Sequence, residues 1–495
     1  MRFASRLGLT VINCVLVLVS GSARAAESSP PNVVLILADD LGWTDLACYG
    51  SDLHETPRLD EFAQGGLRFT QAYAMSVCTP SRAMLMTGRH AARLGITTWS
   101  EGALNPETDR PLLPAVSRPN LPRSEITLAE RFRTAGYLTA AIGKWHLGDA
   151  SHFPETQGFD INVGGNHWGA PMTFWWPYRG SGRFGPEYRY VPALDLGEPG
   201  EYLTDRLTDE AIRVIDHAET EERPFFLYLV HYAPHTPIEA KRADVDYFAL
   251  RMSPFRRHQH PVYAAMIRSL DESVGRVLDR LRESEMGRNT IVIFASDNGG
   301  YIGSDPKSGW DLPVTSNAPL RSGKGSLYEG GIRVPLIIRW PGKTRSGSVC
   351  DTPVSLADLF PTLTDGMADP TDPNDDPYVT LDGIDLKPLI EDPTITLDSG
   401  PLYFHFPHYY PTTTPASAIR EGDWKLIEYL EDGRSELYNL ATDPGERQDR
   451  TTSAPQQWAD LRQKLAAWRV KVGAAMPTPN PPTPSPRSAA ASQPR

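Results

Sequence analysis

Cysteine is scarce in this chain, with four residues among 495: Cys14, Cys48, Cys78 and Cys350. A disulfide framework is excluded, because the cysteines beyond residue 25 allow at most one bridge. An ordinary hydrophobic core must therefore stabilise the fold, and we expect Cys48 and Cys350 to be free, buried thiols. Cys78 needs its own explanation, because it stands in the stretch MSVCTPSRAMLMTGRH.

Apolar runs long enough to cross a membrane are also missing. The run Leu7–Val19 is shorter than the ~20 residues that a transmembrane helix needs. Two arginines precede it and small residues around Ala25 follow it, which is typical of a secretory signal. Cys14 lies inside the run rather than after it, which argues against a lipoprotein anchor. We expect residues 1–25 to be a cleaved signal peptide and the mature protein to be secreted or periplasmic, without a membrane anchor.

Basic charge is in deficit as well. The chain has 49 Lys and Arg against 61 Asp and Glu, a formal net charge of −12. Loss of the three arginines of the signal lowers this charge to −15. Such a surface argues against nucleic acid as a partner. It also repels anionic polymers at long range, so an anionic substrate must be bound by a local basic pocket.

The apolar stretches that are present predict the fold class. PNVVLILADD, at residues 31–40, is a continuous apolar run of the kind found in strands buried on both faces. Further strand-like runs alternate with stretches of helical periodicity, at 125–148, 204–219, 224–237, 263–284 and 289–300. This alternation predicts an α/β fold with a large, mostly parallel central sheet sandwiched by helices.

The C-terminal part has a different pattern. Short alternating stretches separated by Asp-Gly turns at 417–446 predict a small antiparallel sheet, followed by a helix near 455–470. We therefore expect a catalytic domain at 26–390 and a C-terminal subdomain at 391–475. The proline-rich tail, 476–495, is predicted to be disordered.

Polar side chains end three of the expected strands: Asp39 and Asp40, His235, and Asp297 with Asn298. Ligands of open α/β sheets bind beyond the carboxyl ends of the strands. Three carboxylates and an amide oxygen suit Ca²⁺ or Mg²⁺ better than zinc. Each acidic pair alone is more often only the start of a turn, but together they predict a metal site.

Three basic residues add a second pattern. In GKWHLG, Lys144 and His146 face the same side of an extended segment. Lys324 lies among glycines that let the backbone approach an anion closely. A structural histidine and a lysine on a mobile surface loop explain these stretches about equally well when each is taken alone.

The position of Cys78 limits the kinds of reaction in which this residue could take part, but it does not identify one. Pro80 in a first helical turn would place Cys78 at a helix N-terminus, with Arg82 on the same face, and this arrangement favours a bound oxyanion. A thiolate phosphatase would need arginine six residues after the cysteine, where the chain has Met84. A cysteine protease gains nothing from a hard metal, and a thiolate is a poor ligand for calcium.

Cys78-Thr79-Pro80-Ser81-Arg82, followed by LMTGR, resembles the C-x-P-S-R signature of type I sulfatases. Further stretches follow in the order of that family: PNVVLILADDLGWTDLACYG, GYLTAAIGKWHLG, HTP, SDNGG, GGIRVPLIIRWPG and ELYNLATDPGE. The resemblance covers roughly residues 31–470 and is strongest to arylsulfatases and N-acetylgalactosamine-6-sulfatase-like enzymes. It implies a fold of the alkaline phosphatase superfamily and a sulfuric ester hydrolase.

The resemblance also implies a modified residue and a metal. In that family a formylglycine-generating enzyme oxidises the cysteine during export, so Cys78 would become formylglycine. The hydrated aldehyde replaces a soft sulfur by hard oxygens, which suit a hard cation. Ca²⁺, in preference to Mg²⁺, would be bound by the modified Cys78 together with Asp39, Asp40, Asp297 and Asn298.

Catalytic roles follow from the same resemblance. One hydroxyl of the hydrate would attack sulfur, while Arg82, Lys144 and Lys324 neutralise the sulfate oxygens. His235 would protonate the leaving alcohol, with help from Lys324. His146 would then take the proton of the second hydroxyl so that sulfate is released. A serine could not release sulfate in this way, because it has no second hydroxyl on the same carbon.

The substrate is indicated less directly. The segment 167–192 is rich in aromatic residues and glycine, so it is a candidate for stacking on sugar rings, with His167 near a hydroxyl. His405 and His408, in 403–411, are candidates for contacts from the smaller subdomain; both segments fit plain packing as well. We expect a sulfated carbohydrate, or an aryl sulfate, as substrate. The alternatives are a phosphate monoester or phosphonate ester hydrolase, and an inactive secreted binding protein in which Cys78 stays unmodified.

Overall fold

The computed structural model describes residues 30–367 and 380–481. The predicted signal peptide lies outside these residues, and so does most of the predicted tail. Within the described part of the chain, no helix combines the length and the apolar character of a bilayer-spanning segment.

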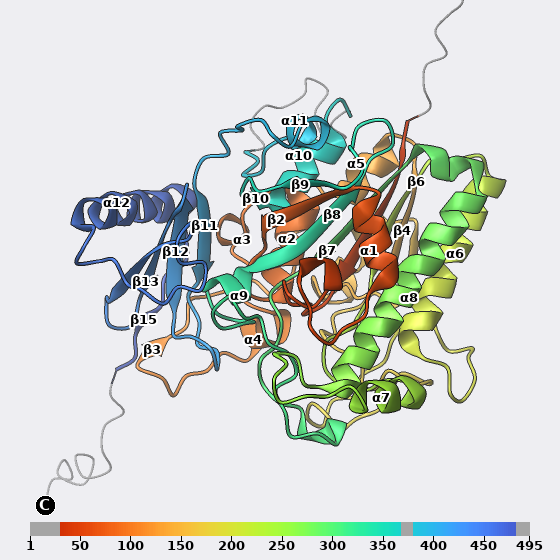
Figure 1. Cartoon of the computed structure of the whole chain (residues 1–495), viewed down its shortest axis with the longest axis horizontal. Helices are drawn as coiled ribbons and strands as arrows, with labels where there is room; N and C mark the ends of the chain where they lie inside the picture. The colour runs from red at the N-terminus through yellow and green to blue at the C-terminus, as the bar shows by residue number, and fades with distance from the viewer. Residues whose placement is uncertain (1–29, 368–379, 482–495) are drawn as a thin grey trace, which may run out of the picture. The chain divides into compact units, whose positions relative to one another are not determined.

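A nine-stranded sheet forms the centre of the fold (Figure 1). Its strands are β1 (Asn32–Ala38), β2 (Leu67–Tyr73), β4 (Leu138–Gly143), β5 (Ile161–Val163), β6 (Phe225–Val230), β7 (Thr290–Ser296), β8 (Arg333–Arg339), β9 (Ser348–Cys350) and β10 (Val354–Ser355). The order is β10-β2-β8-β7-β1-β6-β4-β5, and β9 also pairs with β2. Only β8 runs antiparallel to its neighbours, β2 and β7, among the described strands of this sheet. The predicted mostly parallel sheet is confirmed.

Strand β1 shows why the sheet needs helices on both faces. All of its residues are buried. Val33, Leu35 and Leu37 contribute to one apolar core, whereas Val34 and Ile36 contribute to another on the opposite face. Such alternation follows from the two-residue repeat of a strand. Each face must therefore be covered by its own layer of helices.

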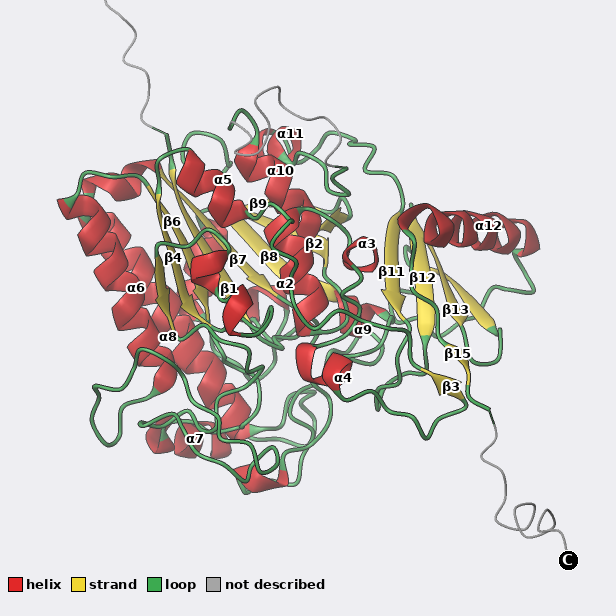
Figure 2. Cartoon of the chain, turned by 180° about the vertical axis from the view of Figure 1, so that it is seen from behind, coloured by secondary structure: helices red, strands yellow, loops and turns green. Residues whose placement is uncertain are grey.

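Two groups of helices supply these layers. The first group packs on the face of Val34 and consists of α1 (Pro57–Gln64), α6 (Leu203–Thr220) and α8 (Pro261–Glu283). The second packs on the face of Val33 and includes α2 (Cys78–Thr87), α5 (Leu128–Thr134) and α10 (Leu359–Thr364). Figure 2 shows α2 and α10 in front of the sheet in the view from behind. The shorter helices are α3 (Ala91–Leu94), α4 (Ser100–Leu104), α7 (Arg242–Ala249), α9 (Glu329–Ile332) and α11 (Lys387–Glu391).

The C-terminal part forms the predicted antiparallel sheet. Its strands β11 (Leu402–Phe406), β12 (Ala416–Glu421), β13 (Trp424–Tyr429) and β14 (Ser435–Asn439) pair in chain order. The predicted helix is α12 (Pro455–Val472), whose buried Leu461 and Leu465 share an apolar cluster with Ile419 and Leu426 of the sheet. The chain between α11 and β11 crosses the predicted domain boundary, which stays a prediction.

The start of the predicted disordered tail has structure. Thr478–Pro479 forms strand β15, which pairs with β3 (Leu112–Leu113). The Asn480 side chain donates hydrogen bonds to the carbonyls of Thr108 and Arg110. The backbone groups of the tail find partners on a neighbouring loop, which the composition of the tail does not indicate. Residues 482–495 of the predicted tail lie outside the described residues.

The remaining cysteines form no bridge. Cys48 and Cys350 are free thiols, as predicted. Cys350 is buried, whereas Cys48 is half-buried rather than fully buried. Burial raises the pKa of Cys48 to about 12, so this thiol stays protonated at neutral pH.

Candidate active site

The acidic residues that follow β1 and β7 meet at one edge of the sheet, because these strands are adjacent and parallel. The backbone N–H of Asp40 donates to Asp297 Oδ1 at 3.1 Å, and Asn298 Nδ2 donates to Asp40 Oδ1 at 2.8 Å. Asp40 has a left-handed φ of 67°, which turns the chain directly after the strand. This turn lets the consecutive Asp39 and Asp40 serve one cluster, and all four side chains are buried. The structure thus brings the predicted metal ligands together.

Each carboxylate of this cluster pairs with one basic side chain. Lys144 Nζ donates to Asp39 Oδ2 at 2.6 Å, and Lys324 Nζ donates to Asp40 Oδ2 at 2.8 Å. Arg82 donates from Nε and Nη2 to Asp297 Oδ2, at 2.9 and 2.7 Å. Three negative and three positive groups leave the cluster formally neutral, so a bound divalent cation would make it positive.

Arg82 and Lys144 hold the carboxylates rather than line a cavity. Both side chains are fully buried. The third donor of Arg82, Nη1, is bound to the carbonyl of Lys144 at 3.1 Å. Both residues were predicted to contact sulfate oxygens, which stays a prediction; in the structure they donate hydrogen bonds to Asp39, Asp297 and a backbone carbonyl. Lys324 is the one of the three predicted cations that reaches the adjoining cavity, as far as the described residues go.

Two oxygens of the cluster are unsatisfied, which fits a cation. Asp39 Oδ1 and Asn298 Oδ1 are buried, and neither has a hydrogen-bond partner among the described residues. Burial raises the pKa of Asp39 well above its usual range; Lys144 opposes this effect, and Asp297 adds to it. A buried oxygen without a partner costs free energy, and a divalent cation would remove that cost. The donor set consists of oxygens only, which suits Ca²⁺.

Cys78 lies beside this cluster at the start of a helix. It is the first residue of α2, as predicted, and it is buried. Its sulfur and oxygens of Asp39 and Asp297 lie within 4.8 Å of one another. The first turn of a helix carries free N–H groups and a positive partial charge, which favour an anionic group.

The charges around Cys78 favour its ionised form. Burial by itself would raise the pKa of the thiol, but Lys144, Lys324 and His146 outweigh it and lower the pKa to about 6. A local positive potential is therefore present at this residue, although the mature surface is predicted to be acidic. Such a potential suits the binding of an anionic substrate.

Cys78 opens into a cavity of about 220 Å³. Four of the predicted catalytic residues line it: Cys78, His146, His235 and Lys324. Other lining residues were not indicated by the sequence, namely Trp99, Glu101, Phe184, Arg189 and Tyr410. Phe184 and Arg189 belong to the aromatic segment 167–192, and Tyr410 belongs to the segment 403–411. The composition of the sequence indicated these segments as candidates for substrate contacts, but it did not indicate these three residues. Trp99 and Glu101 carried no signal.

His146 is held by Glu101 of α4. His146 Nε2 donates to Glu101 Oε2 at 2.6 Å, and Glu101 Oε1 accepts from the N–H of Gly169 at 3.1 Å. A Cβ at Gly169 would lie 2.4 Å from the imidazole ring, so only glycine fits beside it. Glu101 binds Nε2, so Nδ1 is the ring nitrogen left to exchange a proton with a bound group, and it has no hydrogen-bond partner within the described ranges. Burial by itself would lower the pKa of His146, but Glu101 and Cys78 outweigh it and raise this pKa above its usual value.

His235 follows β6 and lies near the same oxygen of Asp40 as Lys324. Its Nδ1 donates to the carbonyl of Thr236 at 2.7 Å, and its Nε2 lies 3.6 Å from Asp40 Oδ2. Burial and then the charge of Lys324 lower the pKa of His235 to about 3, so the imidazole is neutral in the free protein. A bound anion would oppose the effect of Lys324 and raise this pKa.

The three predicted substrate contacts do not line this cavity. His405 is buried in β11 and bonds Ser417 Oγ and the carbonyl of Ala475, both at 2.8 Å. His408 Nε2 bonds Thr97 Oγ1 at 2.8 Å. His167 packs on Trp168, with ring centroids 4.1 Å apart. None of the three is among the described lining residues, because the strand pairing and loop packing direct them elsewhere.

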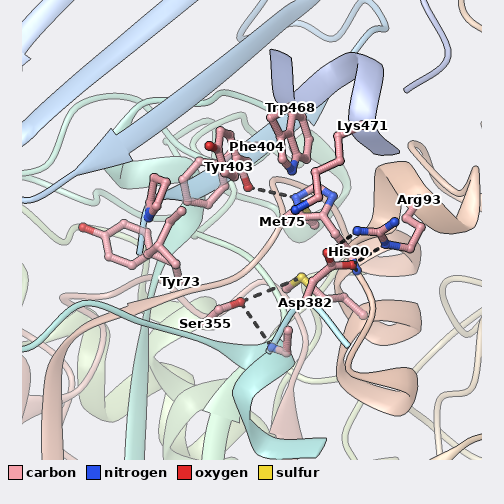
Figure 3. A pocket seen from close by; sticks show the side chains of 14 residues that line it. Tyr73, Met75, His90, Arg93, Ser355, Asp382, Tyr403, Phe404, Trp468 and Lys471 are labelled. Atoms are coloured by element: carbon pink, nitrogen blue, oxygen red, sulfur yellow. Dashed lines mark hydrogen bonds and ion pairs between the residues drawn. The ribbon is translucent and has the colours of Figure 1, made fainter. Parts of the chain in front are cut away.

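A second cavity lies between the central sheet and the C-terminal sheet (Figure 3). Its volume is about 150 Å³. Several polar groups that line it are bound within the protein: Arg93 contacts Asp382 at 2.6 Å, and His90 Nε2 bonds the carbonyl of Tyr403 at 2.9 Å. These contacts join α3 to β11, and no predicted catalytic or metal-binding residue lines the cavity. We interpret it as part of the packing between the sheets.

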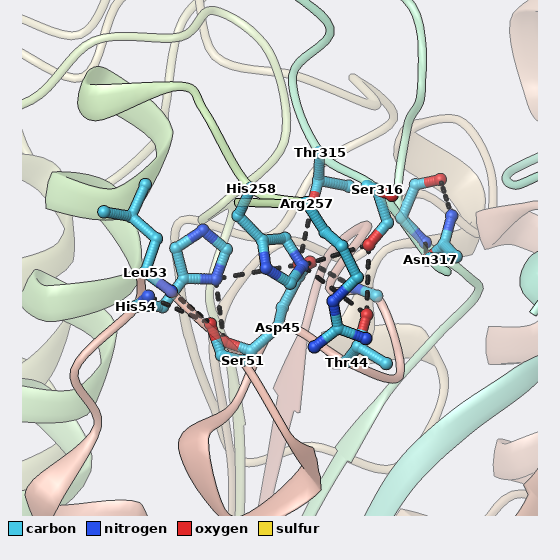
Figure 4. Close-up of polar contacts among 12 residues, drawn as sticks. Thr44, Asp45, Ser51, Leu53, His54, Arg257, His258, Thr315, Ser316 and Asn317 are labelled. Carbon is cyan, nitrogen blue, oxygen red and sulfur yellow. Dashed lines mark hydrogen bonds and ion pairs between the residues drawn. The ribbon is translucent and has the colours of Figure 1, made fainter. Parts of the chain in front are cut away.

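A second buried group of possible metal ligands, Asp45, His54 and His258, follows β1 (Figure 4). In this group the aspartate is saturated. Asp45 Oδ1 accepts from Thr315 Oγ1 at 2.5 Å, and Oδ2 accepts from the N–H of Gly42 and from Tyr263 Oη, both at 2.7 Å. We refer to Asp45, His54 and His258 as the Asp45 group.

Comparison with known proteins agrees with the geometry. The Sulfatase family model matches residues 31–368, and the model for the C-terminal region of N-sulphoglucosamine sulphohydrolase matches residues 323–471. Human N-acetylgalactosamine-6-sulfatase is 33% identical over 463 residues, which cover 86% of this chain and 83% of the relative. A sulfatase from Formosa agariphila is 32% identical over 92% of this chain and 91% of its own length.

A solved structure supports the same assignment of the fold. The crystal structure of Ps i-CgsB in complex with k-i-k-neocarrahexaose superposes with a TM-score of 0.70 at 30% identity. The match covers 89% of this chain and 92% of the other. The likeness therefore includes both the central sheet and most of the C-terminal part.

Proposed function

The chain belongs to the sulfatase family, and from this premise we propose that it is an exported enzyme that desulfates carbohydrates with a formylglycine made from Cys78 and a bound Ca²⁺. Members of the family are sulfuric ester hydrolases, so the reaction class is hydrolysis of a sulfate ester. One observation carries the proposal: Cys78 lies at a helix N-terminus beside buried, unpartnered oxygens of Asp39 and Asn298.

The proposed ligands of Ca²⁺ are the residue at position 78 and four neighbours: Asp39, Asp40, Asp297 and Asn298. When bound, the cation supplies positive charge that polarises the sulfate group and the attacking oxygen. Lys144 and Arg82 donate hydrogen bonds to Asp39 and Asp297, which hold both side chains in position for this purpose. Lys324 lines the cavity and neutralises the sulfate oxygens as their charge grows.

Formylglycine at position 78 supplies, as its hydrate, an oxygen nucleophile and a second hydroxyl on the same carbon. His146 is placed to take the proton of that second hydroxyl at Nδ1, because Glu101 occupies Nε2. Its proton transfer allows sulfate to leave. Glu101 stabilises the protonated imidazole that results, in the same way as the carboxylate of a catalytic triad.

The leaving alcohol receives its proton from His235, and Lys324 assists through its positive charge. His235 is neutral before the substrate enters, and the sulfate anion raises its pKa on binding. The ammonium of Lys324 stays charged, because, against the effect of burial, Asp40 raises its pKa well above the usual range. Both groups line the cavity and lie near Asp40 Oδ2, whereas His146 is bound to Glu101.

A carbohydrate substrate is supported by the surroundings of the cavity. Tyr410 lines both the Cys78 cavity and a larger groove of about 620 Å³. The groove is rich in tyrosine and carries two arginines: Tyr328, Tyr409, Tyr429, Arg110 and Arg434. Aromatic faces suit sugar rings, and the similar structure Ps i-CgsB was solved with a neocarrahexaose. We infer that sugar residues next to the sulfated one occupy this groove.

A panel of sulfated oligosaccharides tests the proposal. The mature protein, produced with a formylglycine-generating enzyme, is expected to release sulfate from at least one sugar in a Ca²⁺-dependent manner. A matched set of phosphate esters is expected to react far more slowly. Cleavage of nitrophenyl sulfate alone, with no sugar desulfated, would contradict the carbohydrate assignment.

A further inference from the structure

Arg189 is a cation of the Cys78 cavity that has no role in the steps above. It lines the cavity and is only 8% exposed. Its guanidinium carbon lies 4.6 Å from the ring centroid of Trp168 and 4.5 Å from that of Phe184. The two aromatic rings hold the guanidinium by stacking, which uses none of its N–H donors.

Within the described residues these donors form no hydrogen bond to the protein. Among the described residues, Nε of Arg189 is buried without a hydrogen-bond partner. The nearest carboxylates are Glu187, at 3.6 Å, and Glu101, at 3.9 Å, beyond hydrogen-bond distance. Glu101 is already occupied by His146 and by the N–H of Gly169. A buried guanidinium with unused donors is costly unless a ligand supplies the acceptors.

The backbone holds Arg189 in this position. Its N–H and carbonyl form a two-way bridge with Gly180, at 2.8 and 2.9 Å. Asn166 Nδ2 donates to the carbonyl of the next residue, Tyr190, at 2.9 Å. The side chain is therefore anchored before any ligand binds, as expected of a preorganised binding residue.

We propose that Arg189 binds a second anionic substituent of the substrate, a sulfate ester or a carboxylate, on the sulfated sugar or the sugar next to it. The proposal rests on the proposed function, since it concerns the same cavity. The proposed cation site and Lys324 bind the sulfate that is cleaved. Arg189 lies near Glu101, which in turn is bound to His146 and Gly169. The preferred substrates are then polyanionic sugars rather than singly sulfated ones.

The test compares three substrates in the wild-type protein and in Arg189→Met. The probes are N-acetylgalactosamine 6-sulfate, its 4,6-disulfate, and the disaccharide of a hexuronate with N-acetylgalactosamine 6-sulfate. If another sugar is cleaved better in the panel, the same three forms of that sugar are used. Wild type is expected to prefer a dianionic probe, and the variant to lose that preference by roughly 10- to 100-fold in the ratio of kcat/KM values.

Arg179→Met is the matched control. Arg179 lies in the same segment, is about half exposed and is not among the described residues of the cavity. This change is expected to leave the ratio as in wild type. Arg189→Lys keeps the charge but loses the planar fork, so an intermediate ratio is expected. The melting temperature of Arg189→Met is expected to stay close to that of wild type, because Met can still pack on Trp168 and Phe184 and the removed donors formed no hydrogen bond.

The outcomes separate the two proposals. If wild type cleaves sulfated sugars but prefers no dianionic probe, the Arg189 proposal is wrong and the proposed function stands. An equal loss on all probes in Arg189→Met, with a lower melting temperature, would assign Arg189 a structural role instead. If no sulfated sugar is cleaved at all, both proposals fail. A preference limited to the disulfate or to the uronate identifies which anion Arg189 binds.

Discussion

The Asp39 cluster (Asp39, Asp40, Asp297 and Asn298) and the Asp45 group both include residues that follow β1, both are buried, and both bring together side chains that metals use. They differ in whether their buried side-chain oxygens accept hydrogen bonds. Asp39 Oδ1 and Asn298 Oδ1 have no hydrogen-bond partner within the described residues, and Arg82 Nη2 lies 3.5 Å from Asp39 Oδ1. Both oxygens of Asp45, in contrast, are bound by hydrogen-bond donors, including Tyr263 Oη. Tyr263 Oη also lies 3.2 Å from the carbonyl of Asp40, so the two regions touch.

The hydrogen bonds of the buried oxygens distinguish a metal site from a structural network. A saturated carboxylate has no reason to attract a cation, and its donors would have to be displaced first. Unpartnered buried oxygens, in contrast, are stable only when something else compensates them. We therefore interpret the Asp39 cluster as the cation site and the Asp45 group as a support that fixes the turn after β1.

The largest expected effect comes from Asp39→Asn. The change keeps the size of the side chain but removes a charge that the cation needs. Activity is expected to fall roughly 1,000-fold or more, since electrostatic stabilisation of this kind is worth about 3–4 kcal/mol. Bound calcium, measured by atomic emission on the purified protein, is expected to fall from about one per chain to near zero.

Asp45→Asn makes the same chemical change in the saturated group, so each variant serves as the control of the other. The folded Asp45→Asn protein is expected to retain about one calcium per chain. Loss of calcium in Asp45→Asn, with calcium retained in Asp39→Asn, would reverse the assignment of the two groups.

The next effect is on stability rather than activity. In Asp45→Asn an NH2 group replaces one carboxylate oxygen and faces either the N–H of Gly42, which cannot accept, or a hydroxyl such as that of Thr315, which must turn to accept and then leaves its own proton without an acceptor. Buried donors left without acceptors cost about 2–4 kcal/mol in total. Thermal unfolding monitored by circular dichroism is expected to show a clearly lower melting temperature. An unchanged melting temperature would mean that these hydrogen bonds do not support the fold.

A smaller effect concerns pH. Burial lowers the pKa of His54 from 6.5 to about 4, so the unfolded chain takes up this proton more readily than the folded one. The neutral form of His54 therefore contributes to the free energy of unfolding above pH 6.5, and this contribution is lost as the pH falls toward 4. It amounts to up to about 3 kcal/mol.

His54→Gln removes this titration. The melting temperature of the variant is expected to fall less than that of wild type between pH 7 and about 4.5. The pKa of His258 is raised instead, so His258→Gln is expected to alter the pH dependence above pH 6.5. Identical pH profiles for wild type and His54→Gln would contradict a buried, neutral His54.

The sequence predicted the cation cluster because residue types that bind metals occur where the local pattern also indicates the end of a strand. Asp39, Asp40, Asp297 and Asn298 directly follow apolar strands, so their meeting point follows from strand order alone. Lys324 and His235 could be named because their motifs resemble those of the family. The central sheet was predictable for the same reason, since apolar runs and helical periodicity alternate clearly along the chain.

The walls of the cavity could not be predicted in this way. Glu101 and Arg189 come from a short helix and a loop, where no periodicity shows which way a side chain points. The position of Arg189 depends on its bridge to Gly180, a tertiary feature. His405 was placed wrongly in space for a related reason. The pairing of β11 with β12 sets His405 opposite Ser417, and the sequence does not reveal this register.

The antiparallel direction of β8 was equally hidden. Its sequence, RVPLIIR, is as apolar as that of the parallel strands, and its interior is buried like theirs. Direction depends on the connection through α9 and the loop that carries Lys324, which long-range packing decides. A mostly parallel sheet was therefore as much as the pattern could predict.

The central claim is that oxidation of Cys78 supplies the nucleophile beside the cation site. Mass spectrometry of the tryptic peptide Phe69–Arg82, from protein made with a formylglycine-generating enzyme, tests it most directly. The account predicts a peptide about 18 Da lighter than the cysteine form, in a fraction that rises in step with specific activity. A fully active preparation in which this peptide carries only an intact thiol would contradict it.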